Sequence, residues 1–119
     1  MNRNELEEFI VDNYSVSPEY LWDKYPTFAV FRHKENKKWF AIVMTINKKK
    51  LGIDEDGLVD VVNLKCDTVG MFSLVQQKGI FPAYHMNKNH WISICLDNSV
   101  DKQMIKVLID MSYNLTNTR

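Results

Sequence analysis

Five side chains in the sequence have the chemistry to hold a metal ion: His33, His85, His90, Cys66 and Cys95. Structural zinc sites draw their ligands from close pairs such as Cys-x2-Cys, and the chain contains no such pair. The two histidines at 85 and 90 are separated by an expected turn, a spacing that suits neither a helical pair nor a zinc knuckle. We therefore expect no metal site and no cofactor.

The motifs of nucleophilic and phosphate-transfer enzymes are also missing. The chain has no Gly-x-Ser-x-Gly, no His-Glu-x-x-His and no glycine-rich phosphate loop. Cys66 or Cys95 could pair with a histidine, but both lie within predicted strands, where burial raises the pKa of a thiol and leaves little thiolate. We expect no catalytic residues and no enzymatic activity.

Lysines and aromatic side chains suggest a different chemistry, the binding of nucleic acid. Three consecutive lysines follow a predicted strand: Lys48, Lys49 and Lys50. Lysines attract phosphates in a salt-dependent way, and Trp39, Tyr84 and Trp91 could stack on bases. Lys38 begins the same strand, about 30 Å from Lys48 at ~3.4 Å per residue, so the basic residues form two clusters. A solvated loop that keeps the sheet end soluble explains each cluster as well.

Polar and aromatic residues gather densely in one short stretch: Tyr84, His85, Asn87, Lys88, His90 and Trp91. One interpretation is structural, because asparagines tolerate left-handed turn conformations and the aromatic rings would pack around such a turn. The other is a concave polar and aromatic surface that receives a ligand or a strand of nucleic acid. Both interpretations stay open at this point.

Composition limits the class of protein. The chain has 119 residues, 45% of them hydrophobic, and no formal net charge, which predicts one globular domain over residues 1–119. A nucleic-acid-binding domain is usually basic overall, whereas here the basic excess is concentrated in residues 32–50, with seven basic and one acidic side chain. No apolar stretch approaches the ~20 residues of a membrane span, and two cysteines do not make a disulfide framework. We expect a monomeric, cytoplasmic protein without membrane contact.

Hydrophobic periodicity predicts the elements that must position these residues. It indicates a helix at 4–14, strands at 28–33, 38–47 and 58–66, a short helix at 68–77, an extended stretch at 82–86, a strand at 91–96 and a helix at 98–115. This order is typical of an α+β fold, an antiparallel sheet with the N- and C-terminal helices packed on one face.

Alternation along the strands assigns their faces. It places Ile42, Met44, Leu64, Ile92 and Ile94 toward the helices, on the side of Phe40 and Ile46. Trp39 and Trp91 then share the opposite face, which no helix covers. The stripe of the last helix that should face the core contains Val100, Met104, Val107, Leu108, Met111 and Leu115.

Four stretches of the chain resemble one known family. They are PAYHMNKNHWISICLD at 82–97, KWFAIV at 38–43, VNLKCD at 62–67 and SYNL at 112–115. Their content and order are similar to the MmcQ/YjbR family, and the YHMNK…HW string is the most specific part. The resemblance implies a CyaY/frataxin-like fold and a label as DNA-binding proteins, and it brings no catalytic residues.

The sequence therefore predicts a non-enzymatic binding protein with DNA as the expected partner. The alternative is a protein- or small-ligand-binding module that uses the surface between Tyr84 and Trp91. The predicted binding residues are the six of that stretch together with Trp39 and the three lysines at 48–50.

Overall fold

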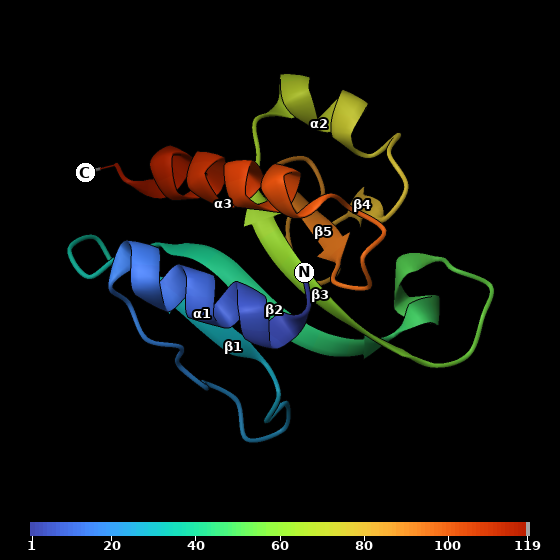
Figure 1. Cartoon of the computed structure of the whole chain (residues 1–119), viewed down its shortest axis with the longest axis horizontal. Coiled ribbons are helices and arrows are strands. Elements are labelled where there is room, and N and C mark those ends of the chain that lie inside the picture. Colours follow the sequence, from blue (N-terminus) through green and yellow to red (C-terminus); the bar gives the residue numbers. More distant parts are fainter. Residues whose placement is uncertain (119) are drawn as a thin grey trace.

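A computed structural model describes residues 1–118 of the chain (Figure 1). Its elements are α1 (Arg3–Tyr14), β1 (Ala29–Arg32), β2 (Trp39–Asn47), the 3-10 helix η1 (Lys48–Leu51), β3 (Leu58–Lys65), α2 (Thr68–Leu74), β4 (Ile80–Pro82), β5 (Trp91–Cys95) and α3 (Lys102–Thr116). The strands form one sheet in the order β1-β2-β3-β5-β4, and every neighbouring pair is antiparallel. The predicted α+β class is confirmed.

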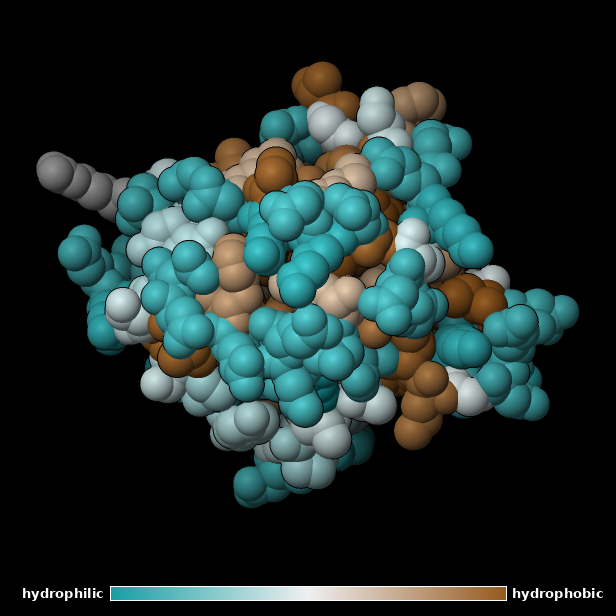
Figure 2. Space-filling view, in the orientation of Figure 1, coloured by the Kyte–Doolittle hydropathy of each residue, from teal (hydrophilic) through white to brown (hydrophobic). Residues whose placement is uncertain are grey.

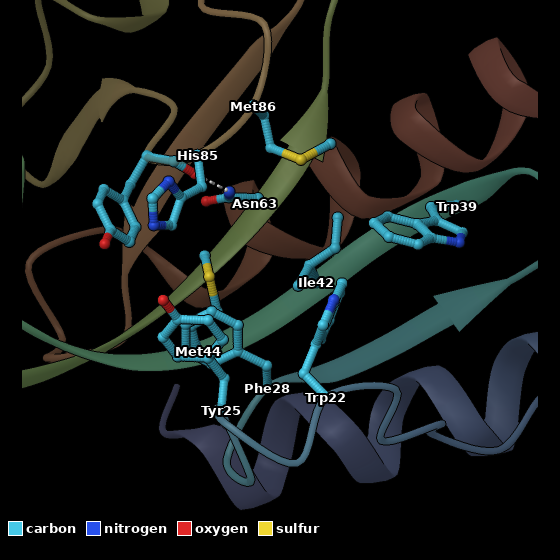
Figure 3. Close-up of a pocket in the computed structure, with 10 residues that line it drawn as sticks. Trp22, Tyr25, Phe28, Trp39, Ile42, Met44, Asn63, His85 and Met86 are labelled. Carbon is cyan, nitrogen blue, oxygen red and sulfur yellow. Dashed lines mark hydrogen bonds between the residues drawn. The ribbon is translucent and has the colours of Figure 1, made fainter.

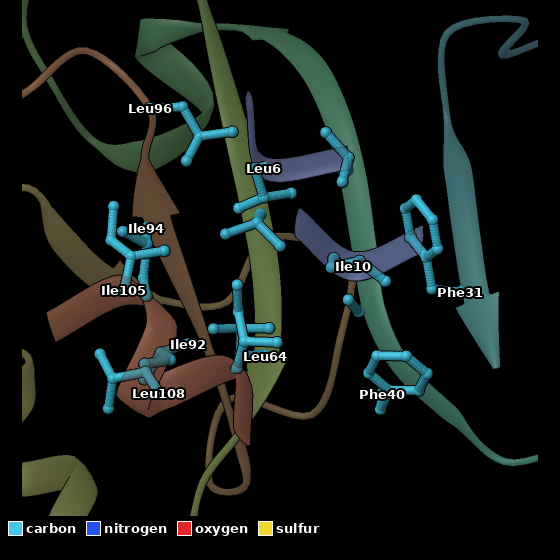
Figure 4. Close-up of a cluster of buried hydrophobic side chains, with 14 of the residues drawn as sticks. Leu6, Ile10, Phe31, Phe40, Leu64, Ile92, Ile94, Leu96, Ile105 and Leu108 are labelled. Carbon is cyan, nitrogen blue, oxygen red and sulfur yellow. The ribbon is translucent and has the colours of Figure 1, made fainter. Parts of the chain in front are cut away.

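The two long helices, α1 and α3, lie side by side on the same face of the sheet (Figure 1). The core between helices and sheet includes Leu6, Ile10, Leu64, Ile92, Ile94, Ile105, Leu108 and Ile109 (Figure 4). The outward surfaces of these helices are mostly hydrophilic (Figure 2), as expected for elements that bury one stripe against a sheet.

A bulge in β2 changes the face assignment of that strand. Phe31 pairs with Ala41 while the next residue, Arg32, pairs with Trp39, so Phe40 is an extra residue opposite β1. Phe40 and Ala41 both belong to the core under the helices, because a bulge interrupts the strict alternation of a strand. The prediction for Ile42, Met44 and Ile46 was therefore wrong, since these three side chains lie on the face away from the helices.

The face away from the helices carries a second apolar cluster. Its buried members are Phe28, Val30, Ile42, Met44, Ile46, Val59, Val61 and Cys95. Trp39 and Trp91 pack against this cluster, as their predicted face requires. Two segments without regular structure cover it, the aromatic segment (residues 20–28) and the turn segment (residues 83–90).

The helices begin at other residues than predicted, and α3 is rotated about its axis so that a different stripe faces the core. Asn2 caps α1 in a capping box with Glu5, and Asp101 caps α3, which begins later than the residue 98 expected from the sequence. The buried stripe of α3 is Ile105, Leu108, Ile109, Ser112 and Thr116, and Val107 is 66% exposed. Polar contacts of Ser112 account for this orientation of α3. The Ser112 hydroxyl donates to the Phe40 carbonyl (2.6 Å) and accepts from the Lys65 amide (2.8 Å), which turns Ser112 toward the sheet.

The chain between α2 and β5 also differs from the prediction. Helix α2 ends at Leu74, and β4 begins at Ile80, earlier than the extended stretch expected at 82–86. His85 has a φ of 62°, a left-handed conformation that an extended strand cannot contain.

Candidate aromatic ligand pocket

A cavity of about 190 Å³ opens on the face of the sheet away from the helices (Figure 3). We call it the aromatic pocket, and its lining residues are Trp22, Tyr25, Phe28, Trp39, Ile42, Met44, Asn63, Tyr84, His85 and Met86. Strands β2 and β3 supply the floor, and the aromatic segment and the turn segment supply the walls. The bulge at Phe40 is what allows Trp39, Ile42 and Met44 to share this floor.

The aromatic rings of the wall hold one another in fixed orientations. Trp22 lies edge-to-face with Trp39 (centroids 5.6 Å apart) and with Phe28 (6.1 Å). Tyr25 stacks on Phe28 at 4.8 Å with an angle of 15° between the rings. These are the arrangements that aromatic quadrupoles favour, so the wall is preorganised.

The aromatic segment is tied to the sheet just before it reaches the pocket. Glu19 forms a two-hydrogen-bond bridge with Val30 of β1. The Glu19 carboxylate also receives two hydrogen bonds from the Arg32 guanidinium, each 2.7 Å long. This bidentate pair is the strong, geometrically specific kind, and it fixes the start of the segment that carries Trp22.

A buried polar network positions the turn segment. The Tyr84 amide donates to the Ser93 hydroxyl (3.0 Å), which donates to Asn63 Oδ1 (2.5 Å). Asn63 Nδ2 in turn donates to the Tyr84 carbonyl (2.8 Å, Figure 3). Both backbone groups of Tyr84 are thereby held by β3 and β5, and the next residue, His85, takes its left-handed conformation beside the cavity.

Asn87 and Lys88 stabilise the turn that follows. The Asn87 carbonyl accepts from the amides of His90 (3.1 Å) and Trp91 (3.0 Å), and the Asn87 side chain accepts from the Asn89 amide (2.9 Å). Lys88 Nζ donates to the Ala83 carbonyl (2.7 Å). The structural interpretation therefore accounts for the hydrogen bonds of these two residues.

The predicted binding residues divide into three groups. The first group, Trp39, Tyr84 and His85, meets in the aromatic pocket. The ring centroids of Tyr84 and His85 are 3.9 Å apart. The second group consists of the residues of the turn that do not line the cavity: Asn87, Lys88, His90 and Trp91. Trp91 packs on the same sheet face outside the cavity. His90 is exposed, with Nδ1 at 3.5 Å from the Thr68 hydroxyl.

The third group, the lysines at 48–50, lies far from the pocket. They form η1 at the end of β2 opposite to Trp39. Lys48 pairs with Glu55 (3.3 Å) and Lys49 with Asp56 (3.0 Å), so acidic residues of the next loop offset their charge. The structure does not bring this cluster together with the aromatic residues.

Seven lining residues were not among the predicted binding residues: Trp22, Tyr25, Phe28, Ile42, Met44, Asn63 and Met86. A signal existed for the first three, because residues 20–28 contain four aromatic side chains in nine positions. Such a density exceeds what a solvated connection needs. Asn63 carried no signal, since a single asparagine in a strand shows nothing of its partners.

The titratable groups of the molecule add little reactivity. Burial raises the pKa of both the Cys66 and the Cys95 thiols to about 11, so each stays protonated at neutral pH. Within residues 1–118 no three His, Cys, Asp or Glu side chains are gathered as a metal site would require. Among the described residues that line the cavity, none carries a carboxylate, and Lys24 Nζ lies 5.7 Å from the centre of the Tyr25 ring.

Known proteins match the chain over almost its whole length. The family model described as YjbR matches residues 11–115. The chain belongs to the YjbR family. The Bacillus subtilis protein YyaQ is 40% identical over 116 residues, which are 98% of each chain. The Escherichia coli O157:H7 protein YbdF is 40% identical over 60 residues, which are 48% of each chain.

Solved structures share the YjbR architecture. A crystal structure of a Pseudomonas syringae protein superposes with a TM-score of 0.96 at 42% identity and covers 98% of this chain and 100% of its own. The Deinococcus radiodurans protein DR2400 has a TM-score of 0.75 at 23% identity and shows the fold alone. In residues 1–118 no helix has the length and apolarity needed to cross a bilayer.

Proposed function

We propose that this YjbR protein is a binding protein that takes a flat, apolar ring of its ligand into the aromatic pocket. The observation that carries this proposal is the preformed group of aromatic rings, Trp22, Trp39 and Phe28, around an open apolar cavity. Aromatic rings and methionines on the inside, with a few polar groups at the edge, are typical of ligand sites.

The size of the cavity limits the group that enters it. A dry cavity of about 150 Å³ is known to hold benzene, and sites for drug-sized ligands measure about 300–1,000 Å³. The aromatic pocket, at about 190 Å³, fits one ring system rather than a whole large ligand. The ligand is therefore a small aromatic compound or presents one ring from a larger body.

The proposal gives the pocket a binding role rather than a catalytic one. Its polar members are tied into the structure, as Asn63 is to Tyr84, and no carboxylate stands among its described lining residues. The two thiols are buried and protonated, and they belong to the cores on opposite faces of the sheet.

We also infer that the protein is a cytoplasmic monomer with the CyaY/frataxin-like fold. The reduced cysteines support the location, and the two helices on one face of an antiparallel sheet support the fold.

A titration of the full chain with 1-methylindole, followed by amide NMR shifts, tests the proposal. We expect saturable shifts concentrated in residues 22–28 and 84–86, because these segments form the walls. Shifts that do not saturate, or that lie on the helices, would contradict it.

Single-stranded nucleic acid is a second candidate, with a base as the ring that enters the pocket. The observation in its favour is Lys65, which pairs with Trp91 across the β3–β5 ladder and so projects to the same face. Because β3 lies between β2 and β5, Lys65 separates Trp39 from Trp91. Aromatic side chains around a lysine are the pattern of a strand-binding groove.

The nucleic-acid candidate has its own test. Lys65→Gln should lower the slope of log affinity against log salt by about 0.7, the value for one phosphate contact to a single strand. Trp91→Ala should weaken binding of an oligonucleotide and leave 1-methylindole binding unchanged. An unchanged salt slope in Lys65→Gln would argue against this candidate.

A further inference from the structure

Asn63 stands out among the lining residues because it is polar and almost fully buried. Only 1% of its surface is exposed, yet its side chain lines the aromatic pocket. A buried amide without partners costs free energy, so each of its hydrogen-bonding groups has to be accounted for.

The orientation of the Asn63 amide follows from its neighbours. The Tyr84 carbonyl can only accept, so the atom 2.8 Å from it must be the nitrogen, Nδ2. The oxygen, Oδ1, then accepts from the Ser93 hydroxyl, whose oxygen in turn accepts from the Tyr84 amide. The network permits no exchange of the two amide atoms.

This arrangement leaves one N–H group of the Asn63 amide without a hydrogen bond. An asparagine amide nitrogen carries two N–H groups, and one of them is directed at the Tyr84 carbonyl. The second N–H has no acceptor among residues 1–118, while the side chain borders the cavity. An acceptor on a ligand in the pocket would complete the hydrogen bonding of this amide.

We propose that the natural ligand presents a heteroaromatic ring with a hydrogen-bond acceptor on its edge, a ring nitrogen or a ring carbonyl, to Asn63 Nδ2. This inference rests on the proposed function and names the ligand class for the same site. The aromatic wall recognises the flat face of the ring, and the amide recognises its edge. A ring without an acceptor leaves the buried N–H unpaired, which is how a site rejects a close isostere.

Two ligands of the same shape test the inference. 1-Methylindole and 1-methylbenzimidazole differ by one ring nitrogen, which is an acceptor in the second compound. The ratio of their dissociation constants is measured for the wild type and for Asn63→Leu, so that the cost of dehydrating the ring nitrogen cancels. We expect the wild type to favour 1-methylbenzimidazole by roughly three- to tenfold more than the variant does, the effect of one net hydrogen bond.

A second measurement avoids any substitution, because Asn63→Leu also removes the bond to Tyr84. In the wild type, one of the two Asn63 side-chain amide protons should shift downfield with 1-methylbenzimidazole and stay in place with 1-methylindole. Equal ratios in the two proteins, or no selective proton shift, would overturn the inference while 1-methylindole binding upholds the pocket. Failure of both compounds to bind would overturn the inference and the proposed function together.

Discussion

Trp39 and Trp91 lie on the same face of the sheet and pack against the same apolar cluster, but Trp39 lines the aromatic pocket and Trp91 does not. The two indoles are a matched pair, because both are half-buried and each begins a strand. Trp39 packs edge-to-face against Trp22, so the loss of its indole removes the contact between the floor and the wall of the cavity.

The first prediction uses this pair. Trp39→Ala should weaken binding of 1-methylindole by tenfold or more, since each aromatic stacking contact contributes about 1–3 kcal/mol. Trp91→Ala should leave that affinity within a factor of two, although both variants lose some stability. Titration calorimetry of the two variants, with thermal melts as a check on folding, provides the comparison. An equal loss of affinity in both would mean that the pocket is not the binding site.

The second prediction concerns the face that α3 buries. Ile109→Asp should unfold the domain, because an unpaired carboxylate in a packed core costs several kcal/mol against a typical total of about 5–15. Val107→Asp, two residues earlier on the exposed side of the helix, should change the free energy of unfolding little. Urea denaturation of both variants measures the difference. Similar losses in the two would refute the observed rotation of the helix.

The third prediction is a dependence of stability on pH that comes from His33. Burial lowers the pKa of this imidazole below its ordinary value of 6.5, with Lys38 lowering it further and the Tyr113 carbonyl and Glu35 opposing. The unfolded chain then binds the proton more readily than the folded chain. The contribution of His33 is fully present above pH 6.5 and is lost as the pH falls from there through the lowered pKa of the folded state.

His33→Gln separates this effect from that of the carboxylates. The histidine Nε2 lies 2.8 Å from the Thr116 hydroxyl, a contact that a glutamine amide can replace. The free energy of unfolding, measured by urea at several pH values, should fall less steeply below pH 6.5 in the variant than in the wild type. Parallel curves for the two proteins would exclude His33 as the origin.

The fourth prediction concerns the lysine cluster at 48–50. Lys48 and Lys49 are paired with acidic residues and lie at the far end of β2 from Trp39. Changing Lys48, Lys49 and Lys50 to glutamine should therefore leave the affinity for single-stranded DNA and its salt slope unchanged. A slope reduced by two or three would instead place phosphates on this cluster.

The fold was largely predictable from the sequence because long amphipathic patterns dominate it. The strands 38–47 and 58–66 and the last helix appear within a few residues of their expected bounds. The errors arose where one residue overrides a pattern. Phe40 forms a bulge that reverses the faces of Ile42 and Met44, and the alternation of apolar residues on both sides of it gives no sign of the shift.

The candidate site was predictable only in part. Trp39, Tyr84 and His85 were found because aromatic and polar residues cluster near them in sequence. Asn63 and Ser93 were not, because their bond joins residues 30 positions apart and depends on strand register. The aromatic segment has no helical or strand periodicity. Its sequence shows that it is rich in aromatic residues, but it does not show which part of the sheet the segment crosses.

Intermolecular nuclear Overhauser effects between the protein and bound 1-methylindole test the central claim most directly. Met44 and Met86 both line the cavity, one from the floor and one from the turn segment, and each carries a methyl group that gives a resolved signal. The account predicts contacts from the indole ring protons to both methyl groups in the same complex. Ring contacts to neither methyl group, with contacts to side chains of α1 or α3 instead, would contradict it.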